Sequence, residues 1–169
     1  MIGMALKEMR KSEGLTQGQL AIELNLSKSM VCEIENGNRK LNPDIASHSL
    51  KKIDNPNYAL DVLHLFSDGF TAPRLNGKSV EYHRLALEEF AMREMEEAVQ
   101  ILKDVSLVKP PQESDLEELE RIEDVVGELE DAALAIRNLQ AILATEYQLP
   151  LKELKKNRSK IHKERGWIK

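Results

Sequence analysis

Apolar residues recur three and four positions apart along most of this chain, which is the spacing of one face of an α-helix. The first such stretch, residues 5–12, places Leu6 and Met9 on one face. Aromatic residues make up only 4% of the chain, whereas β-sheets favour aromatic and β-branched residues. The sequence therefore predicts an all-α protein.

Two short helices are predicted in immediate succession near the amino terminus. Thr16 can cap the first helix, and Gln19, three residues later, can complete a capping box. Asn25 lies in the following turn, where the backbone needs a left-handed conformation that Asn tolerates. Ser27 is a second N-cap and Gly37 a left-handed helix end, so the pair is predicted to cross closely. Its inward-facing residues are expected to be Leu20, Ala21, Leu24, Val31 and Ile34.

The pair contains the runs Leu15-Thr16-Gln17, Leu20-Ala21, Leu26-Ser27 and Ile34-Glu35-Asn36-Gly37. These runs resemble the helix-turn-helix of the phage-repressor-like family of Cro and Xre type, over about residues 4–66. The sequence departs from that family at Asn25, where glycine is usual. The resemblance implies a five-helix DNA-binding head, residues 1–67, with the second helix of the pair in the major groove.

Exposed side chains at the start of that second helix are the candidate base-reading groups. Lys28 could donate to guanine, Ser29 could bond either kind of base edge, and Glu33 could accept from cytosine. Met30 could touch a thymine methyl group, whereas packing or solvent exposure explains Cys32 more simply. The predicted base-reading set is Lys28, Ser29, Met30, Cys32 and Glu33.

Phosphate contacts are expected at two neighbouring places. Gln17 begins the first helix of the pair, where backbone N–H groups and a side-chain amide can hold a phosphate, as the resemblance also implies. The polar loop after the second helix is expected to follow the DNA backbone, although cations in such loops are often only solvated. The predicted phosphate contacts are Gln17, Asn36, Asn38, Arg39 and Lys40.

Two further helices are predicted to complete the head. Asn42 and Pro43 suit the cap and first turn of a helix that runs to about Ile53. After a break at Asn55-Pro56-Asn57, a strongly apolar fifth helix is expected over residues 58–66.

Residues 68–78 contain Gly and Pro without apolar periodicity, which predicts a hinge. A long helix is expected from Ser79 to about Val105. Ser114 and Glu117 have the spacing of a capping box for a second long helix. The apolar stripe of the first long helix comprises Leu87, Ala91, Met95, Ala98, Leu102 and Val105.

The second long helix repeats apolar residues with three-four spacing over about four heptads. This stripe fits either a coiled-coil dimer seam or the inner face of a helical hairpin within one chain, and both can coexist in a four-helix dimer. Gln140 falls at a seam position, where a polar residue can fix the register. The predicted oligomerisation residues are Leu119, Ile122, Val126, Leu129, Ala133, Ile136, Gln140 and Leu143.

The net charge of −5 is distributed unevenly. Residues 1–66 are neutral, residues 67–149 carry −11, and residues 150–169 carry +6. The acidic hairpin, residues 79–148, cannot lie along DNA and is expected to join the heads or to meet another protein. The basic C-terminal helix, residues 149–169, fits contact with DNA phosphate, packing against the acidic hairpin, or docking of a partner protein.

Other classes of protein are disfavoured. A single cysteine allows no intrachain disulfide and no cysteine-pair zinc site, and no apolar run is long enough for a membrane span. Four histidines fall in separate segments, and no phosphate-binding glycine loop or nucleophile motif occurs. We therefore expect no catalytic residue, no metal, no cofactor and no membrane partner.

The sequence thus predicts a transcriptional regulator, a bacterial or phage repressor that binds double-stranded DNA at a two-fold operator as a dimer or higher homo-oligomer. Its expected location is the cytoplasm of a bacterial host, associated with the nucleoid. The alternative is a DNA-binding interaction protein, antitoxin-like or a phage packaging component, whose C-terminal helices bind a dedicated protein partner.

Overall fold

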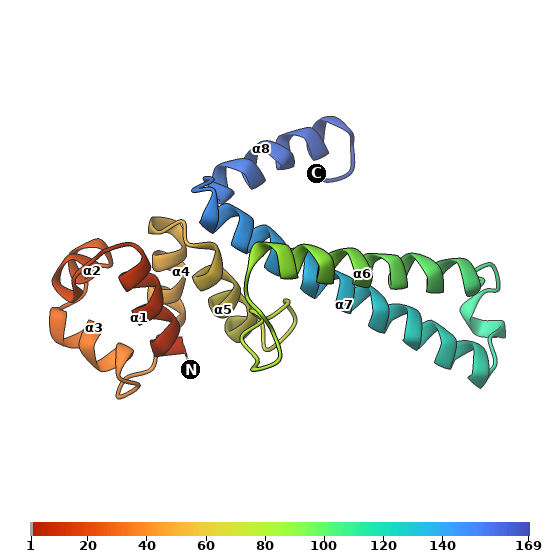
Figure 1. Cartoon of the computed structure of the whole chain (residues 1–169), viewed down its shortest axis with the longest axis horizontal. Helices are drawn as coiled ribbons and strands as arrows, with labels where there is room; N and C mark the ends of the chain where they lie inside the picture. The colour runs from red at the N-terminus through yellow and green to blue at the C-terminus, as the bar shows by residue number, and fades with distance from the viewer. Residues whose placement is uncertain (1) are drawn as a thin grey trace. The chain divides into compact units, whose positions relative to one another are not determined.

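A computed structural model describes residues 2–169, which are all-helical and contain no strand (Figure 1). This confirms the predicted fold class. The chain divides into two compact units, one formed by the residues up to Pro73 with Leu143–Lys169 and the other by Arg74–Ile142. The elements are α1 (Ile2–Ser12), α2 (Gln17–Glu23), α3 (Lys28–Glu35), α4 (Pro43–Lys52), α5 (Pro56–Phe66), α6 (Arg84–Asp104), the short 3-10 helix η1 (Pro111–Glu113), α7 (Leu116–Glu146) and α8 (Leu151–Glu164).

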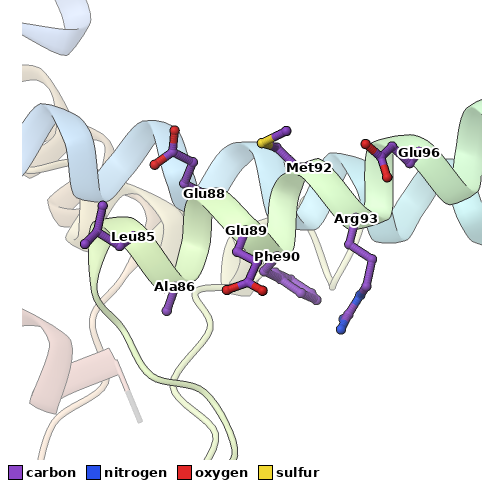
Figure 2. A pocket seen from close by; sticks show the side chains of 8 residues that line it. All are labelled: Leu85, Ala86, Glu88, Glu89, Phe90, Met92, Arg93 and Glu96. Atoms are coloured by element: carbon purple, nitrogen blue, oxygen red, sulfur yellow. The ribbon is translucent and has the colours of Figure 1, made fainter.

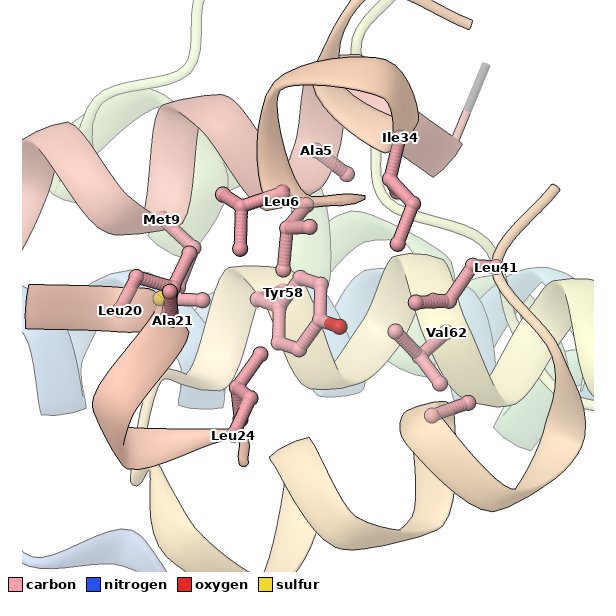
Figure 3. Close-up of a cluster of buried hydrophobic side chains, with 12 residues drawn as sticks. Ala5, Leu6, Met9, Leu20, Ala21, Leu24, Ile34, Leu41, Tyr58 and Val62 are labelled. Carbon is pink, nitrogen blue, oxygen red and sulfur yellow. The ribbon is translucent and has the colours of Figure 1, made fainter. Parts of the chain in front are cut away.

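Helices α1 to α5 form the head around one apolar core. Figure 3 shows Leu6 and the Tyr58 ring within this cluster. The Tyr58 hydroxyl lies 2.8 Å from Ser49 Oγ, so its polar end is hydrogen-bonded although the ring is buried. The core comprises Ala5, Leu6, Met9, Leu20, Ala21, Leu24, Val31, Ile34, Leu41, Ala46, Tyr58 and Val62.

Helix α1 passes very close to the end of α3 at Gly3. A Cβ atom at this position would overlap the carbonyl oxygen of Ile34. Gly3 is therefore required by the packing of α1 against α3, which holds the helix pair in place.

Four helix starts differ from the predictions, the last of them that of α7, and α1 begins at Ile2, three residues before its predicted start. Helix α5 begins two residues early, because Asn55 accepts a hydrogen bond from the Tyr58 N–H (3.0 Å) and caps the helix instead of breaking it. Helix α6 begins after His83 instead of Ser79. The segment before it is tied to α7, where the Leu75 N–H donates to Asn138 Oδ1 (2.8 Å).

The predicted capping box of α7 is shifted by one residue. The Glu118 N–H donates to Asp115 Oδ1 (2.9 Å), and the Asp115 N–H donates to Glu118 Oε2 (3.0 Å). Glu118 also pairs with Lys109 at 2.6 Å. A carboxylate at the cap suits the positive end of the helix, so the expected Ser114 and Glu117 pair is replaced.

Helices α6 and α7 run antiparallel, side by side (Figure 1), and the carboxylates of Glu94, Glu97 and Glu128 come within 4.8 Å of one another. The predicted stripe of α6 is only partly buried: Met95 and Leu102 are exposed. Glu94 takes the inward position next to Met95, and its charge is compensated because Arg93 Nη2 donates to it at 2.7 Å. The buried residues of the two helices are Leu87, Ala91, Glu94 and Ala98 of α6, and Val125, Ala132, Ala135, Asn138, Ala141, Ile142 and Ala144 of α7.

None of the predicted oligomerisation residues of α7 is buried. The side chains at three of these positions are half-buried: Ile122, Ile136 and Leu143. The others are exposed: Leu119, Val126, Leu129, Ala133 and Gln140. The hairpin is therefore packed through a different face of α7 from the one that the heptad pattern indicated.

Helix α8 belongs to the same compact unit as the head. The Lys152 backbone N–H donates to Asp54 Oδ2 (3.1 Å), and Lys152 Nζ donates to the Ile53 carbonyl (2.6 Å). After the helix, Trp167 stacks on His162 with ring centroids 5.5 Å apart. No residue of α8 is buried, so most of its basic side chains face solvent. Within residues 2–169, no helix combines the length and apolarity needed to cross a bilayer.

Candidate nucleic-acid interface

Local hydrogen bonds define the α2–turn–α3 geometry as the sequence predicted. The Gln19 N–H donates to Thr16 Oγ1 (3.2 Å), and Gln19 Oε1 accepts from the Thr16 N–H (2.8 Å). Asn25 has a left-handed φ of 54°, and Gly37 has a φ of 78°. Ser27 Oγ accepts from the Met30 N–H (3.1 Å) and begins α3. The turn is thus fixed by residues within the motif itself.

Helix α3 is anchored by one face and free on the other. Val31 and Ile34 are completely buried in the head core. Lys28 and Ser29 are exposed at the amino-terminal end of the helix. The remaining predicted base-reading residues are half-buried, and they are Met30, Cys32 and Glu33.

Two of the predicted DNA contacts lie against each other. Arg39 Nε is 3.5 Å from Glu33 Oε2, and the two side chains are 47% and 46% exposed. The backbone N–H groups of Asn38 and Arg39 both donate to the Glu33 carbonyl, at 2.9 and 3.1 Å. Because the ion pair is open to solvent it contributes little to stability, and a phosphate could compete for Arg39.

The remaining loop residues are open to solvent. Asn36 Nδ2 lies 3.4 Å from Cys32 Sγ, which places Cys32 beside Asn36 on the outer side of α3. Asn38 and Lys40 are exposed. Within residues 2–169, Lys40 makes no ion pair, so its charge is available to an anion.

A buried ion pair behind the motif was not predicted from the sequence. Arg10 Nε lies 2.5 Å from Glu35 Oε1, and Arg10 Nη2 donates to Glu35 Oε2 (3.0 Å). Gln17 Nε2 donates to the same oxygen (2.9 Å), and Arg10 Nη1 donates to the Leu15 carbonyl (2.9 Å). The side chains of Arg10 and Glu35 are 12% and 0% exposed. The network ties α1 to the start of α2 and the end of α3.

This network gives Gln17 a structural contact in addition to its predicted role at phosphate. One N–H of its side-chain amide donates to Glu35, which leaves the second N–H and the backbone at the start of α2 for an anion. An acidic residue directly after buried Ile34 was the available signal for the network, but its partner is 25 residues away.

Opposing effects set the pKa of Glu35. Burial acts to raise the pKa of this carboxyl group, but hydrogen bonds from Arg10 and Gln17 and the charges of Arg10 and Lys7 together outweigh burial. The net result is a pKa below the ordinary value, so Glu35 is held as the carboxylate.

A helix-turn-helix family model matches residues 6–47, which include the whole capped pair. Residues 6–47 are a helix-turn-helix of the Cro/Xre type. This helix-turn-helix supports the interpretation that the protein is a DNA-binding transcription regulator of that type. Such a regulatory domain is typically not an enzyme. No curated protein and no solved structure matches the chain.

Proposed function

We propose that the protein is a sequence-specific transcriptional repressor of bacterial or phage type that binds a two-fold operator as an oligomer. The helix-turn-helix carries this proposal, because its caps and turn present the exposed amino-terminal end of α3 away from the core. One head covers a half-site, and two heads would read half-sites about 34 Å apart. Such binding over a promoter, at the nucleoid of the host cytoplasm, would exclude polymerase without any chemical step.

Base reading is proposed for the outer side of α3. Lys28 and Ser29 are the most accessible of these groups, and each can bond a base edge. Glu33 would accept from cytosine N4, with its orientation supported by Arg39. Met30 and Cys32 would make the apolar contacts at the edge of this surface.

Phosphate binding is proposed for the flanks of α3. Lys40 needs no rearrangement to meet a phosphate, whereas Arg39 would exchange Glu33 for one. The amides of Asn36 and Asn38 and the backbone at Gln17 would add neutral donors.

Affinity measured against salt concentration separates these two roles. The preferred duplex is first selected from random oligonucleotides, and dissociation constants are then measured on it and on an unrelated duplex. Lys40→Ala should weaken binding to both duplexes and lower the salt slope by about one. Lys28→Ala should cost roughly 1–3 kcal/mol on the preferred duplex alone.

A matched control is Lys78→Ala, which removes an exposed lysine outside the motif and should leave affinity unchanged. Equal losses for Lys28→Ala on both duplexes would contradict its base-reading role. Absence of any preferred duplex for the wild-type protein would contradict the proposed function itself.

The interaction-protein alternative is supported by a different observation, the exposed apolar residues of α6 and α7. A dedicated partner, such as a toxin or a packaging component, would cover them while the head binds DNA. Purification from the native host with a stoichiometric partner bound to the hairpin would favour this alternative.

A further inference from the structure

Helix α7 carries a second apolar stripe besides the one that packs in the hairpin. The packed stripe includes Val125, Ala132 and Ala135. The predicted oligomerisation residues from Leu119 to Leu143, which we call the heptad stripe, lie about 100° further around the helix. Val126, within the heptad stripe, is 55% exposed. Of the eight predicted oligomerisation residues that make up the heptad stripe, five are exposed and three are half-buried within residues 2–169.

Helix α6 shows the same arrangement. Its packed residues include Leu87, Ala91 and Ala98, and a second stripe again lies about 100° further around in the direction of increasing residue number. Figure 2 shows Leu85 and Met92 pointing to one side of α6. The exposed apolar residues of this second stripe are Leu85, Met92, Met95, Val99 and Leu102.

The two second stripes lie on the same side of the hairpin. When each helix is viewed from its own amino terminus, its second stripe is rotated from its packed stripe in the same direction. Because the helices are antiparallel and face each other, equal rotations turn both stripes toward one side. We call this combined surface the hairpin face; it consists of Leu85, Met92, Met95, Val99 and Leu102 of α6 with Leu119, Ile122, Val126, Leu129, Ala133, Ile136 and Gln140 of α7.

The hairpin face is large enough for a stable contact. Its exposed side chains present on the order of 500 Å² of apolar surface, near the upper end for the largest patch on a monomer. A standard interface buries about 800 Å² on each partner, and the polar rim supplies the remainder.

Two residues of opposite charge, Glu88 and Lys103, lie toward opposite ends of the face on α6, and Glu96 lies between them beside the same groove. Glu88 points to the same side of α6 as Met92 (Figure 2), and Lys103 borders the surface groove formed with Met92, Met95 and Val99. Glu88 and Lys103 are 15 residues apart, or about 22 Å along the helix, so they cannot pair within one chain.

The midpoint between these charges lies at Met95. On α7, Leu129 is at a corresponding level, because the carboxylates of Glu94 and Glu128 lie together. The heptad stripe from Leu119 to Gln140 is centred at Leu129 as well. A two-fold axis that crosses the face near Met95 and Leu129 would therefore place the second stripe of α6 against the same stripe of another copy. It would also place the heptad stripe of α7 against the heptad stripe of that copy.

We propose that a second copy of this chain covers the hairpin face in a two-fold, four-helix contact, with α6 of one copy antiparallel to α6 of the other. Lys103 of each copy then faces Glu88 of the other, and Val99 faces Met92. This contact would join the two heads that operator binding requires, and in that respect it rests on the proposed function. The contact itself can be tested without DNA.

Light scattering on the full chain tests the contact directly. The wild-type protein should have a mass of about 38 kDa, twice the 19.2 kDa of one chain. Val126→Lys changes a residue that one chain leaves exposed but the dimer buries, so the dimer dissociation constant should rise on the order of 100-fold. Leu116→Lys, at an 80% exposed site on another side of α7, is the matched control and should remain dimeric.

Charge reversal tests the antiparallel arrangement. Glu88→Lys and Lys103→Glu should each weaken the dimer several-fold, because like charges then face each other twice. The double variant should return to the wild-type dissociation constant. Circular dichroism should show unchanged helix content in every variant, since all the substituted side chains face solvent in one chain.

Several results would overturn the proposal: a monomeric wild-type protein, a Val126→Lys variant that dimerises like wild type, or no recovery in the double variant. A chain that is monomeric alone but binds another protein through Val126 would also overturn it in favour of a heterologous partner. A dimer that prefers no duplex would refute the proposed function while supporting the contact. A monomer that still selects a half-site would refute the contact while supporting sequence-specific DNA binding.

Discussion

Removal of Arg10 is expected to destabilise the head through the buried carboxylate that it leaves behind. In Arg10→Met, Glu35 loses two hydrogen bonds and its counter-charge, and only Gln17 remains as a donor. The Glu35 side chain is 0% exposed, so water cannot replace the lost partner without disturbing the core.

The expected cost is about 3 kcal/mol, the lower end of the range for breaking one side of a buried ion pair. We take the lower end because Gln17 still donates and because Met preserves most of the packing of the Arg10 stem. Replacing both partners, as in Arg10→Met with Glu35→Leu, should recover stability to within about 1 kcal/mol of wild type, since no buried charge remains.

The pH dependence has a defined sign. In the wild-type protein the pKa of Glu35 is lowered, so its contribution to stability is complete above the unfolded-state pKa and is lost as the pH falls through the folded-state pKa. In Arg10→Met, burial would raise that pKa, and the cost of the charged form would disappear at low pH. The difference in the free energy of unfolding between wild type and Arg10→Met should therefore become smaller from pH 7 to pH 4.

Amide hydrogen exchange in α1 and α3 is the suitable assay, because it reports on the head separately from the hairpin. Arg39→Met is a matched control, since it breaks an exposed ion pair and should cost less than about 1 kcal/mol. A loss below 1 kcal/mol for Arg10→Met at pH 7, or a difference that grows toward pH 4, would refute the reasoning.

Two further predictions concern packing that each unit depends on. Gly3→Ala should lower head stability by about 1–3 kcal/mol in the same exchange assay, because the new Cβ overlaps the Ile34 carbonyl; unchanged exchange would show that α1 can move aside. Asn138→Ala should destabilise the hairpin by about 1–3 kcal/mol in urea unfolding, because the Leu75 N–H loses its acceptor. Asn138→Leu keeps most of the side-chain volume but also removes the acceptor, so it should destabilise the hairpin as well, and a stability close to wild type for Asn138→Leu would contradict this explanation.

Features set by neighbouring residues were predictable from the sequence. The Thr16 capping box, the Ser27 cap and the left-handed Asn25 and Gly37 all rest on groups within four positions of one another. Their geometry depends on local sterics and hydrogen bonding, so the helix-turn-helix could be located before its packing was known.

Helix starts outside the motif were harder to predict, because several residues competed for the same role. Ser114 and Asp115 are both good caps, and the partner of Asp115 at Glu118 decided between them. Ser79 would be a suitable cap in isolation, but the segment before α6 is tied to Asn138, a residue 63 positions from Leu75. A single-sequence pattern carries no information about such a contact.

The sequence by itself determined the all-helical class, the helix-turn-helix and the separation of charge along the chain, because these follow from local propensity, spacing and composition. Only the tertiary structure decided that Arg10 meets Glu35 and that α7 packs through its alanine-rich side, leaving its heptad stripe exposed. Both outcomes depend on which surfaces meet in space. Helical periodicity shows that an apolar stripe exists, but several stripes can satisfy it, and the neighbouring helix selects among them.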